Sequence, residues 1–127
     1  IKTMDVATPS GNGSVRVVTG GDDNEIALVT FKCEGDGTIR GVVSCLVEDA
    51  ASSTVTSTKL LANETRVLST SVDQRVRLWD ITAENKLVLS AAKYTTNADT
   101  GSCDIVKLSN NTHSILVAGV GISVWKC

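Results

Sequence analysis

Residues 66–80 read Arg-Val-Leu-Ser-Thr-Ser-Val-Asp-Gln-Arg-Val-Arg-Leu-Trp-Asp, and this stretch decides the fold of the chain. Apolar and polar residues largely alternate through Arg66–Thr70 and again through Arg75–Trp79. A period of two is typical of β-strands that bury one face. The residues between the two runs include Asp73, and aspartate favours tight turns. The stretch therefore predicts two antiparallel strands joined by a short turn.

The same pattern occurs three times along the chain. Residues 17–24 align with residues 67–74, which places the two turn aspartates 50 positions apart. A third copy covers residues 115–125 and has a shorter turn. Hairpins that recur at about 45–50 residues are typical of the blades of a β-propeller.

The second copy resembles a WD repeat, because its last strand closes on Trp79-Asp80. A WD repeat forms one four-stranded blade of a propeller. We therefore expect an all-β fold of β-propeller blades (WD repeats), just under three in number and part of a larger closed propeller. The expected blades are residues 1–49, degenerate and without Trp-Asp, residues 50–96, and residues 97–127, a final blade lacking its outermost strand. The expected strands are 1–7, 15–19, 25–32, 39–47, 55–61, 67–71, 76–81, 87–92, 103–108, 115–118 and 122–125.

Fewer than three blades do not close a ring, since propellers have about 4–8. The chain opens on Ile1 rather than Met, and its first residues resemble the middle of a strand. We expect a piece of a longer protein whose final blade takes its missing strand from the far end of the same polypeptide. Both end blades are expected to expose an apolar face. The expected partner is either the remaining blades of the same protein or a second chain that completes the propeller.

Ser69, Asp73 and Trp79 have the spacing of a hydrogen-bonded network inside a WD blade. In that network the aspartate caps the turn, and the indole N–H donates to a hydroxyl of the preceding strand. The first blade has Thr19 and Asp23 in the matching places. Val29 replaces the tryptophan there, and no Gly-His pair precedes the second blade, so the network is expected to be partial. These five polar and aromatic residues are interpreted as structural.

The turns of neighbouring blades project to one rim of a propeller, and that rim is a usual surface for protein partners. The positions expected there are Asp22, Asn24, Gln74, Arg75 and Asp99, the last within an expected turn at residues 97–100. The alternative is that these side chains are only solvated turn residues.

Composition argues against several classes of function. The net charge of −2, a pI near 5.3 and 3% aromatic residues offer no basic or stacking surface for RNA. Cys33, Cys45, Cys103 and Cys127 are widely spaced and are interpreted as reduced, half-buried strand residues rather than zinc ligands. The alternative is two disulfides in a secreted protein. His113 is expected in an exposed turn. We expect no catalytic residue, metal or cofactor, no enzyme activity, no membrane span, and a cytoplasmic location.

Three Asn-x-Ser/Thr sequences begin at Asn12, Asn63 and Asn110. They match the acceptor pattern for N-glycosylation, which is short and occurs by chance. They are interpreted as surface turns.

The order of motifs resembles one particular family. The residues that carry the likeness are 19–24, 69–75 with Trp79, 97–99, 103–104, 118–122 and Trp125. They resemble the C-terminal end of the large WD-repeat protein that partners an FtsJ-like tRNA 2′-O-ribose methyltransferase. The resemblance implies a non-catalytic subunit that binds the enzyme and supports methylation of the anticodon wobble ribose, with S-adenosylmethionine held by the partner and tRNA contacted indirectly. The alternatives are a general scaffold or substrate adaptor with no RNA role, and direct RNA binding by blades outside this stretch.

Overall fold

The computed structural model describes residues 1–7, 13–61, 65–109 and 112–126, and the chain is all-β throughout them. The first sheet contains β1 (Thr3–Val6), β2 (Ser14–Gly20), β3 (Ile26–Cys33) and β4 (Ile39–Val47). The second sheet contains β5 (Val55–Leu61), β6 (Arg66–Ser71), β7 (Arg75–Ile81) and β8 (Leu87–Tyr94). The third sheet pairs β9 (Ala98–Ser109) with β10 (Thr112–Lys126). Within each sheet the strands follow chain order and are antiparallel. The asparagines of the three Asn-x-Ser/Thr sequences, Asn12, Asn63 and Asn110, lie outside the described residues.

The strands of the first two sheets are those that the alternating pattern predicts. The turns between their second and third strands also repeat, because Asn24 and Gln74 both adopt left-handed backbone, with φ of 63° and 62°. In each turn the preceding aspartate accepts a hydrogen bond from the backbone N–H two residues later, Asp23 from Glu25 and Asp73 from Arg75. The short polar side chain thus holds the tight turn that its sequence predicts.

No helix in the described ranges is long and apolar enough to span a membrane.

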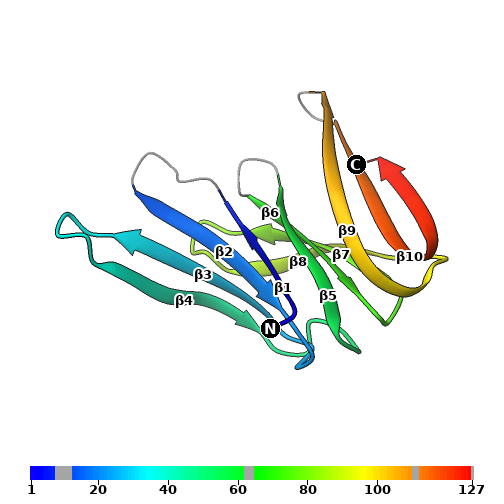
Figure 1. Ribbon diagram of the computed structural model, residues 1–127, viewed down its shortest axis with the longest axis horizontal. Coiled ribbons are helices and arrows are strands. Elements are labelled where there is room, and N and C mark those ends of the chain that lie inside the picture. The colour runs from blue at the N-terminus through cyan, green and yellow to red at the C-terminus, as the bar shows by residue number, and fades with distance from the viewer. Residues whose placement is uncertain (8–12, 62–64, 110–111, 127) are drawn as a thin grey trace.

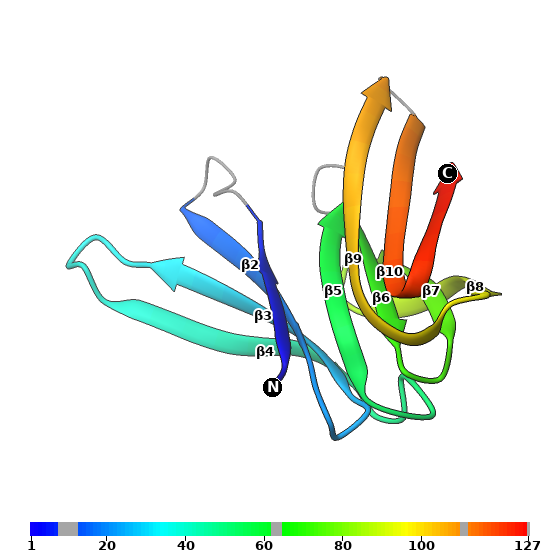
Figure 2. The ribbon, with the colours of Figure 1, turned by 45° about the vertical axis from the view of Figure 1, so that its right-hand side comes forward.

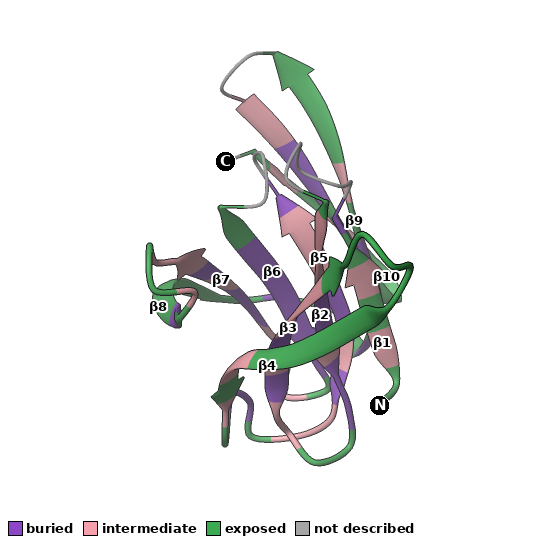
Figure 3. Ribbon diagram, turned by 90° about the vertical axis from the view of Figure 1, so that its left-hand side faces the viewer, coloured by how far each residue is buried: buried purple, intermediate pink, exposed green. Residues whose placement is uncertain are grey.

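The three sheets are arranged like a partly opened fan (Figures 1 and 2). Their first strands lie closest together, with β1 against β5 and β5 against β9. The outer strands β4 and β8 diverge and barely touch. Figure 3 shows the result, since β6 is buried along most of its length whereas much of β4 is exposed.

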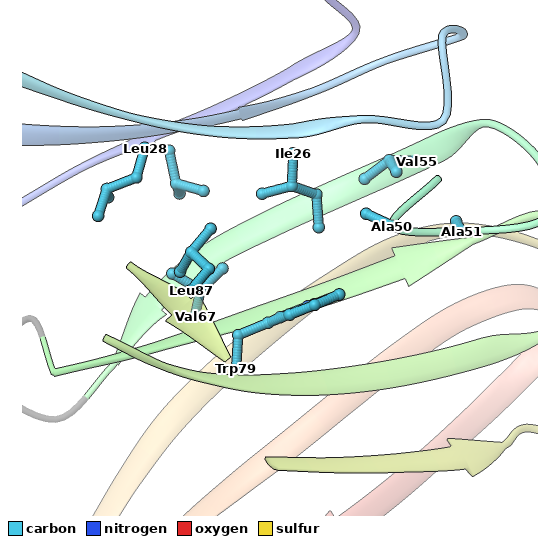
Figure 4. Close-up of a cluster of buried hydrophobic side chains, with 9 residues drawn as sticks. Ile26, Leu28, Ala50, Ala51, Val55, Val67, Trp79 and Leu87 are labelled. Atoms are coloured by element: carbon cyan, nitrogen blue, oxygen red, sulfur yellow. The ribbon is translucent and has the colours of Figure 1, made fainter. Parts of the chain in front are cut away.

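Each gap between neighbouring sheets is filled by its own apolar cluster. Between the first two sheets, Ile26 and Leu28 pack against Trp79 and Leu87 (Figure 4), and Val18 belongs to the same cluster. Between the second and third sheets a second cluster forms. Its members are Leu61, Leu68, Val76, Cys103, Ile115 and Val117, with Leu78, Ile105 and Trp125 partly buried beside them. Full burial of one large apolar side chain contributes about 1.5–3 kcal/mol, so these clusters hold the sheets in sequence.

The two end sheets turn apolar faces to solvent. Met4 and Val6 of β1 pair with Thr19 and Val17, whereas the side chain of Val18 belongs to the cluster between the first two sheets. Met4 and Val6 therefore lie on the opposite face of the first sheet, and both are more than half exposed. On the third sheet the exposed large hydrophobic residues are Val106, Leu108, Leu116, Val120, Ile122 and Val124. Exposed apolar side chains that form a contiguous patch mark interaction surfaces in globular proteins.

Side chains of β1 cover the open edge of β5. The backbone N–H of Thr58 donates to Thr3 Oγ1 at 3.0 Å, and the backbone N–H of Leu60 donates to Asp5 Oδ2 at 2.7 Å. These amides point away from β6 and have no strand partner on that side, so the side chains of the neighbouring sheet supply their acceptors.

Replacing Asp5 with alanine should weaken the contact between the first two sheets. The loss leaves the Leu60 N–H without its acceptor in a partly buried place, which costs about 1–3 kcal/mol. Amide hydrogen exchange at Leu60 is expected to accelerate, and chemical denaturation should show the matching loss of unfolding free energy. Asp5→Asn keeps a side-chain oxygen and is the control. Equal exchange rates at Leu60 in both variants would contradict this role of the carboxylate.

The third sheet differs from its expectation. β9 begins at Ala98, five residues before the expected start, so residues 98–100 are strand and not turn. His113 lies half-buried in β10 opposite Lys107, and its placement in an exposed turn was wrong. Figures 1 and 2 show β10 turning sharply so that its end runs back beside its beginning. Gly121, with a φ of 114° that L side chains rarely adopt, permits that turn.

Gly119 permits a close approach of β9 and β10. A Cβ at this position would lie 2.5 Å from the carbonyl oxygen of Ala98 and 2.9 Å from that of Asp99. Gly119→Ala is therefore expected to destabilise the protein by about 1–3 kcal/mol, since backbone must move. Gly101→Ala is the matched control on the same sheet, because its Cβ would meet nothing nearer than the Asp99 oxygen at 3.8 Å. Thermal denaturation of both variants decides the point, and equal midpoints would refute the steric argument.

Candidate functional site

The second sheet holds the tryptophan contact at its centre. Trp79 on β7 is 5% exposed, and its indole N–H donates to Ser69 Oγ on β6 at 2.9 Å. Ser69 is buried as well. The ring packs in the cluster between the first two sheets (Figure 4), so its polar edge needs this acceptor. The bond ties the two middle strands of the sheet together.

Asp73, in the turn between β6 and β7, is the centre of a larger network. Its carboxylate accepts two hydrogen bonds from the guanidinium of Arg77, at 3.2 and 2.6 Å, and one from the backbone N–H of Arg75 at 2.9 Å. It also accepts the N–H of Ser52 at 3.0 Å, from the segment that links the first two sheets. The side chains of Arg77 and Asp73 are only 7% and 9% exposed. The aspartate therefore caps its own turn and fastens the linking segment to it.

The balance of these contacts sets the pKa of Asp73. Burial alone raises the pKa of a carboxyl. The hydrogen bonds from Arg77, Ser52 and Arg75, with the charge of Arg77, outweigh burial and hold the pKa of Asp73 below its ordinary value. The carboxylate is thus ionised at neutral pH and serves as a fixed acceptor, which is a structural role.

The first sheet has a weaker counterpart. Thr19 is half-buried on β2, and Asp23 is exposed and accepts the Glu25 N–H at 3.2 Å. Here Asp22 makes the contact with the linking segment, since its Oδ1 accepts the Thr54 hydroxyl at 2.9 Å and lies 3.1 Å from the Lys2 ammonium. The hydrogen bonds from Lys2 and Thr54 lower the pKa of Asp22. In this sheet Asp23 caps the turn, and its neighbour Asp22 makes the contact with the linking segment.

The linking segment, residues 48–54, brings the two turns to one end of the molecule. The N–H of Ala51 donates to the carbonyl of Asn24, and the N–H of Val55 donates to that of Gly21. On the other side, Ser52 reaches Asp73. Asp22, Asn24, Gln74 and Arg75 therefore lie on one rim of the molecule. Asp99 lies on the third sheet, exposed, in β9 rather than in the expected turn, with a left-handed φ of 48°.

Tyr94 adds an aromatic group to this rim that sequence reasoning missed. Its ring lies under the guanidinium of Arg75, 4.5 Å from the centroid, and its hydroxyl accepts a hydrogen bond from Arg75. Tyr94 is 63% exposed and Val72 beside the turn is also exposed. Tyrosine and arginine are the residue types enriched at the centres of protein interfaces. The signal in the sequence was the single tyrosine of the chain, one residue before the next linking segment.

Three cysteines lie among the described residues, and none of these three belongs to a group of side chains that could hold a metal ion. Cys33, Cys45 and Cys103 are free and lie in strands, but only Cys45 is half-buried, since Cys33 is exposed and Cys103 is fully buried. Burial raises the pKa of the Cys103 thiol, in spite of hydrogen bonds with Ser57 and Thr70. Among the described residues, no group of three or more His, Cys, Asp or Glu side chains gathers to hold a metal ion.

Two hydrogen-bonded turns thus lie at one end of neighbouring sheets. This rim carries the half-buried Arg75, the exposed Tyr94 and the acidic turn of Asp22 and Asp23. No known family model matches this chain, and no curated protein matches it in sequence.

Proposed function

We propose that this chain is part of a WD-repeat β-propeller and acts as a non-catalytic scaffold subunit. The observation that carries the proposal is the succession of sheets packed through their first strands, with the Asp-capped turn repeated at the same place in two of them. Blades at residues 1–49, 50–96 and 97–127 fit this arrangement. Remaining blades of the same protein, or a second chain, would cover the apolar faces of the two end sheets and close the ring.

The partner we propose is an FtsJ-like tRNA 2′-O-ribose methyltransferase, with the scaffold supporting methylation of the anticodon wobble ribose. The support is the resemblance in the order of motifs along the chain. The rim of Asp22, Asn24, Gln74 and Arg75 is the proposed contact surface, and Tyr94 joins it as the exposed aromatic anchor. The acidic pI supports a protein contact there, with tRNA held by the enzyme.

The experiment is affinity purification of the full-length protein with a charge-reversed rim, Asp22→Lys with Arg75→Glu. Recovery of the methyltransferase should fall at least about tenfold, because losing contacts that contribute about 1.4 kcal/mol or more at the centre of an interface weakens binding by that factor. Wobble ribose methylation of tRNA from the same cells should fall with it. Glu84→Lys is the control, because Glu84 is an exposed charge at the opposite end of the second sheet.

Two results would overturn parts of the proposal. Recovery of ubiquitin-ligase or coat subunits in place of the methyltransferase would replace the tRNA function with that of a general scaffold. Equal loss in the rim and the control variants would remove the rim as the contact surface.

A further inference from the structure

A polar cleft of about 310 Å³ lies between the first two sheets. Its walls are the ends of β3 and β4 next to their connecting turn, and the turn between β7 and β8. The polar residues that line it are Thr30, Lys32, Glu34, Arg40, Ser44 and Asn85. Sites for small molecules begin at about 300 Å³, so the cleft has room for a compact ligand.

The polarity of this cleft follows from the pattern of β3. Side chains at alternate positions of a strand point to the same face. Thr30 and Lys32 therefore continue the face on which Ile26 and Leu28 are buried against the second sheet. The apolar packing ends after Leu28, and polar side chains line the space where the two sheets diverge.

Hydrogen bonds within the walls hold the donors of the cleft in place. Thr30 Oγ1 and Ser44 Oγ lie 2.8 Å apart on neighbouring strands, and both residues are half-buried. Asn85 adopts left-handed backbone in its turn, with a φ of 57°, and its Oδ1 accepts a hydrogen bond from Arg16 Nη2 at 2.7 Å. This bond engages the amide oxygen of Asn85, so the amide nitrogen is the group that can donate to a ligand.

Two cations lie side by side at the cleft, because Lys32 and Arg40 pair with each other across β3 and β4. Like charges directly opposite each other in an antiparallel pair are destabilising. Glu34 offsets part of this charge, since its carboxylate lies 3.5 Å from Arg40 Nε. Both side chains of that ion pair are at least half exposed, and exposed pairs contribute little. A bound anion can therefore compete with Glu34 for Arg40.

The internal repeat shows which charge this face lacks. In the second sheet Arg66 pairs with Asp80, and their charged atoms lie 2.9 Å apart. Arg16 and Thr30 occupy the same register positions in the first sheet. A hydroxyl thus stands where the second sheet has a carboxylate. The cleft is the place in the first sheet where a negative charge is missing, and an anionic ligand would supply it.

We propose that this cleft binds a small phosphate monoester. Lys32 and Arg40 balance the charge of the phosphate, and the hydroxyl pair of Thr30 and Ser44, with the Asn85 amide, donates to its oxygens. Phosphate suits the site better than a carboxylate does, because it carries a charge of about −2 and has more acceptor oxygens. The organic part of the ligand fills the remaining volume. The site is separate from the proposed scaffold contact, since the two turns beside it lie at the end of the sheets opposite the rim.

The probes are inorganic phosphate and glycerol 3-phosphate, titrated calorimetrically into the full-length protein. Both should bind saturably with a dissociation constant below about 1 mM, the monoester at least as tightly as phosphate, and uncharged glycerol should not bind. Hydrogen exchange at residues 30–44 and 82–86 should slow in the bound protein. Failure of both anions to saturate the protein below that concentration would overturn the proposal. Tighter binding of a phosphoserine peptide than of glycerol 3-phosphate would also overturn it, because the ligand would then be a protein.

Thr30→Asp gives the first sheet the carboxylate that Asp80 supplies in the second. It should weaken binding of both anions at least about tenfold, because the new charge repels them. Thr30→Asn is the matched control, since asparagine has the same shape without the charge, and its affinity should stay within about threefold of the parent protein. Equal affinities of Thr30→Asp and Thr30→Asn would refute the anion site.

Lys32→Gln tests the site without touching a half-buried position, because Lys32 is exposed. Its affinity for both anions should also fall at least about tenfold. Lys107→Gln removes the same charge from an exposed position on β9 and is the control. If the two lysine variants bind phosphate equally, the affinity comes from overall charge and the cleft is not the site. The rim variant Asp22→Lys with Arg75→Glu should bind phosphate as the parent protein does, so the two proposals fail separately.

Discussion

Arg77→Met is expected to cost about 3–5 kcal/mol of unfolding free energy, because it leaves the carboxylate of Asp73 buried without its charge partner. Asp73→Asn should cost a similar amount, since it leaves the guanidinium of Arg77 uncompensated at 7% exposure. The double variant should cost less than the sum of the two, because neither unpaired charge remains. Urea denaturation of all four proteins gives this coupling directly.

The control is the ion pair between Arg66 and Asp80 on the same sheet. Its atoms lie 2.9 Å apart, yet both side chains are about half exposed. Arg66→Met should therefore cost less than about 1 kcal/mol. If Arg77→Met and Arg66→Met lower the unfolding free energy equally, burial does not distinguish the two ion pairs. The network around Asp73 then does not stabilise the turn and the linking segment more than an exposed ion pair would.

The contribution of Asp73 should also depend on pH. Its folded pKa lies below the ordinary value, so the stabilisation is complete above the pKa of the unfolded chain, about 3.9, and is lost as the pH falls through the folded value. The cost of Asp73→Asn relative to the parent protein should shrink below about pH 4. A constant difference between pH 7 and pH 3 would show that the carboxylate charge contributes nothing.

The first two sheets could be predicted because their signals are local. Alternating apolar residues define β2, β3, β6 and β7, and an aspartate marks each turn between them. The third sheet could not be predicted in the same detail. Residues 98–102 carry polar and small residues with no alternation, and they become strand because β10 and the neighbouring β5 supply partners from elsewhere in the chain. Tertiary pairing overrides weak local preference here.

The candidate site also contains local contacts that could be predicted and contacts between distant segments that could not. The contact between Trp79 and Ser69 follows from spacing within one hairpin, so the sequence predicts both residues. Arg77 escaped prediction because an arginine in an alternating strand usually points to solvent, and only the buried turn carboxylate turns it inward. Ser52 and Tyr94 contribute through the linking segment and the end of β8, whose positions depend on how neighbouring sheets pack.

Trp79→Ala is expected to lower the unfolding free energy by about 3–5 kcal/mol, because it opens a cavity in the cluster between the first two sheets. Trp79→Phe keeps much of the ring contact but removes the indole N–H, so that Ser69 Oγ loses its donor. This loss should lower the unfolding free energy by about 1–3 kcal/mol. Adding Ser69→Ala to Trp79→Phe should recover part of that loss, since the hydroxyl left unpaired is then gone.

Trp125→Phe in the third sheet separates the hydrogen bond from the general effect of shrinking a ring. Trp125 is only half-buried at the edge of the second cluster, so its replacement should cost less than about 1.5 kcal/mol. Denaturant titrations followed by far-ultraviolet circular dichroism measure all these variants on one scale. If Trp79→Phe is as mild as Trp125→Phe, and Ser69→Ala restores nothing, the indole bond does not hold β6 to β7. The proposed WD-repeat blade would then lose the one side-chain contact that most specifically supports it.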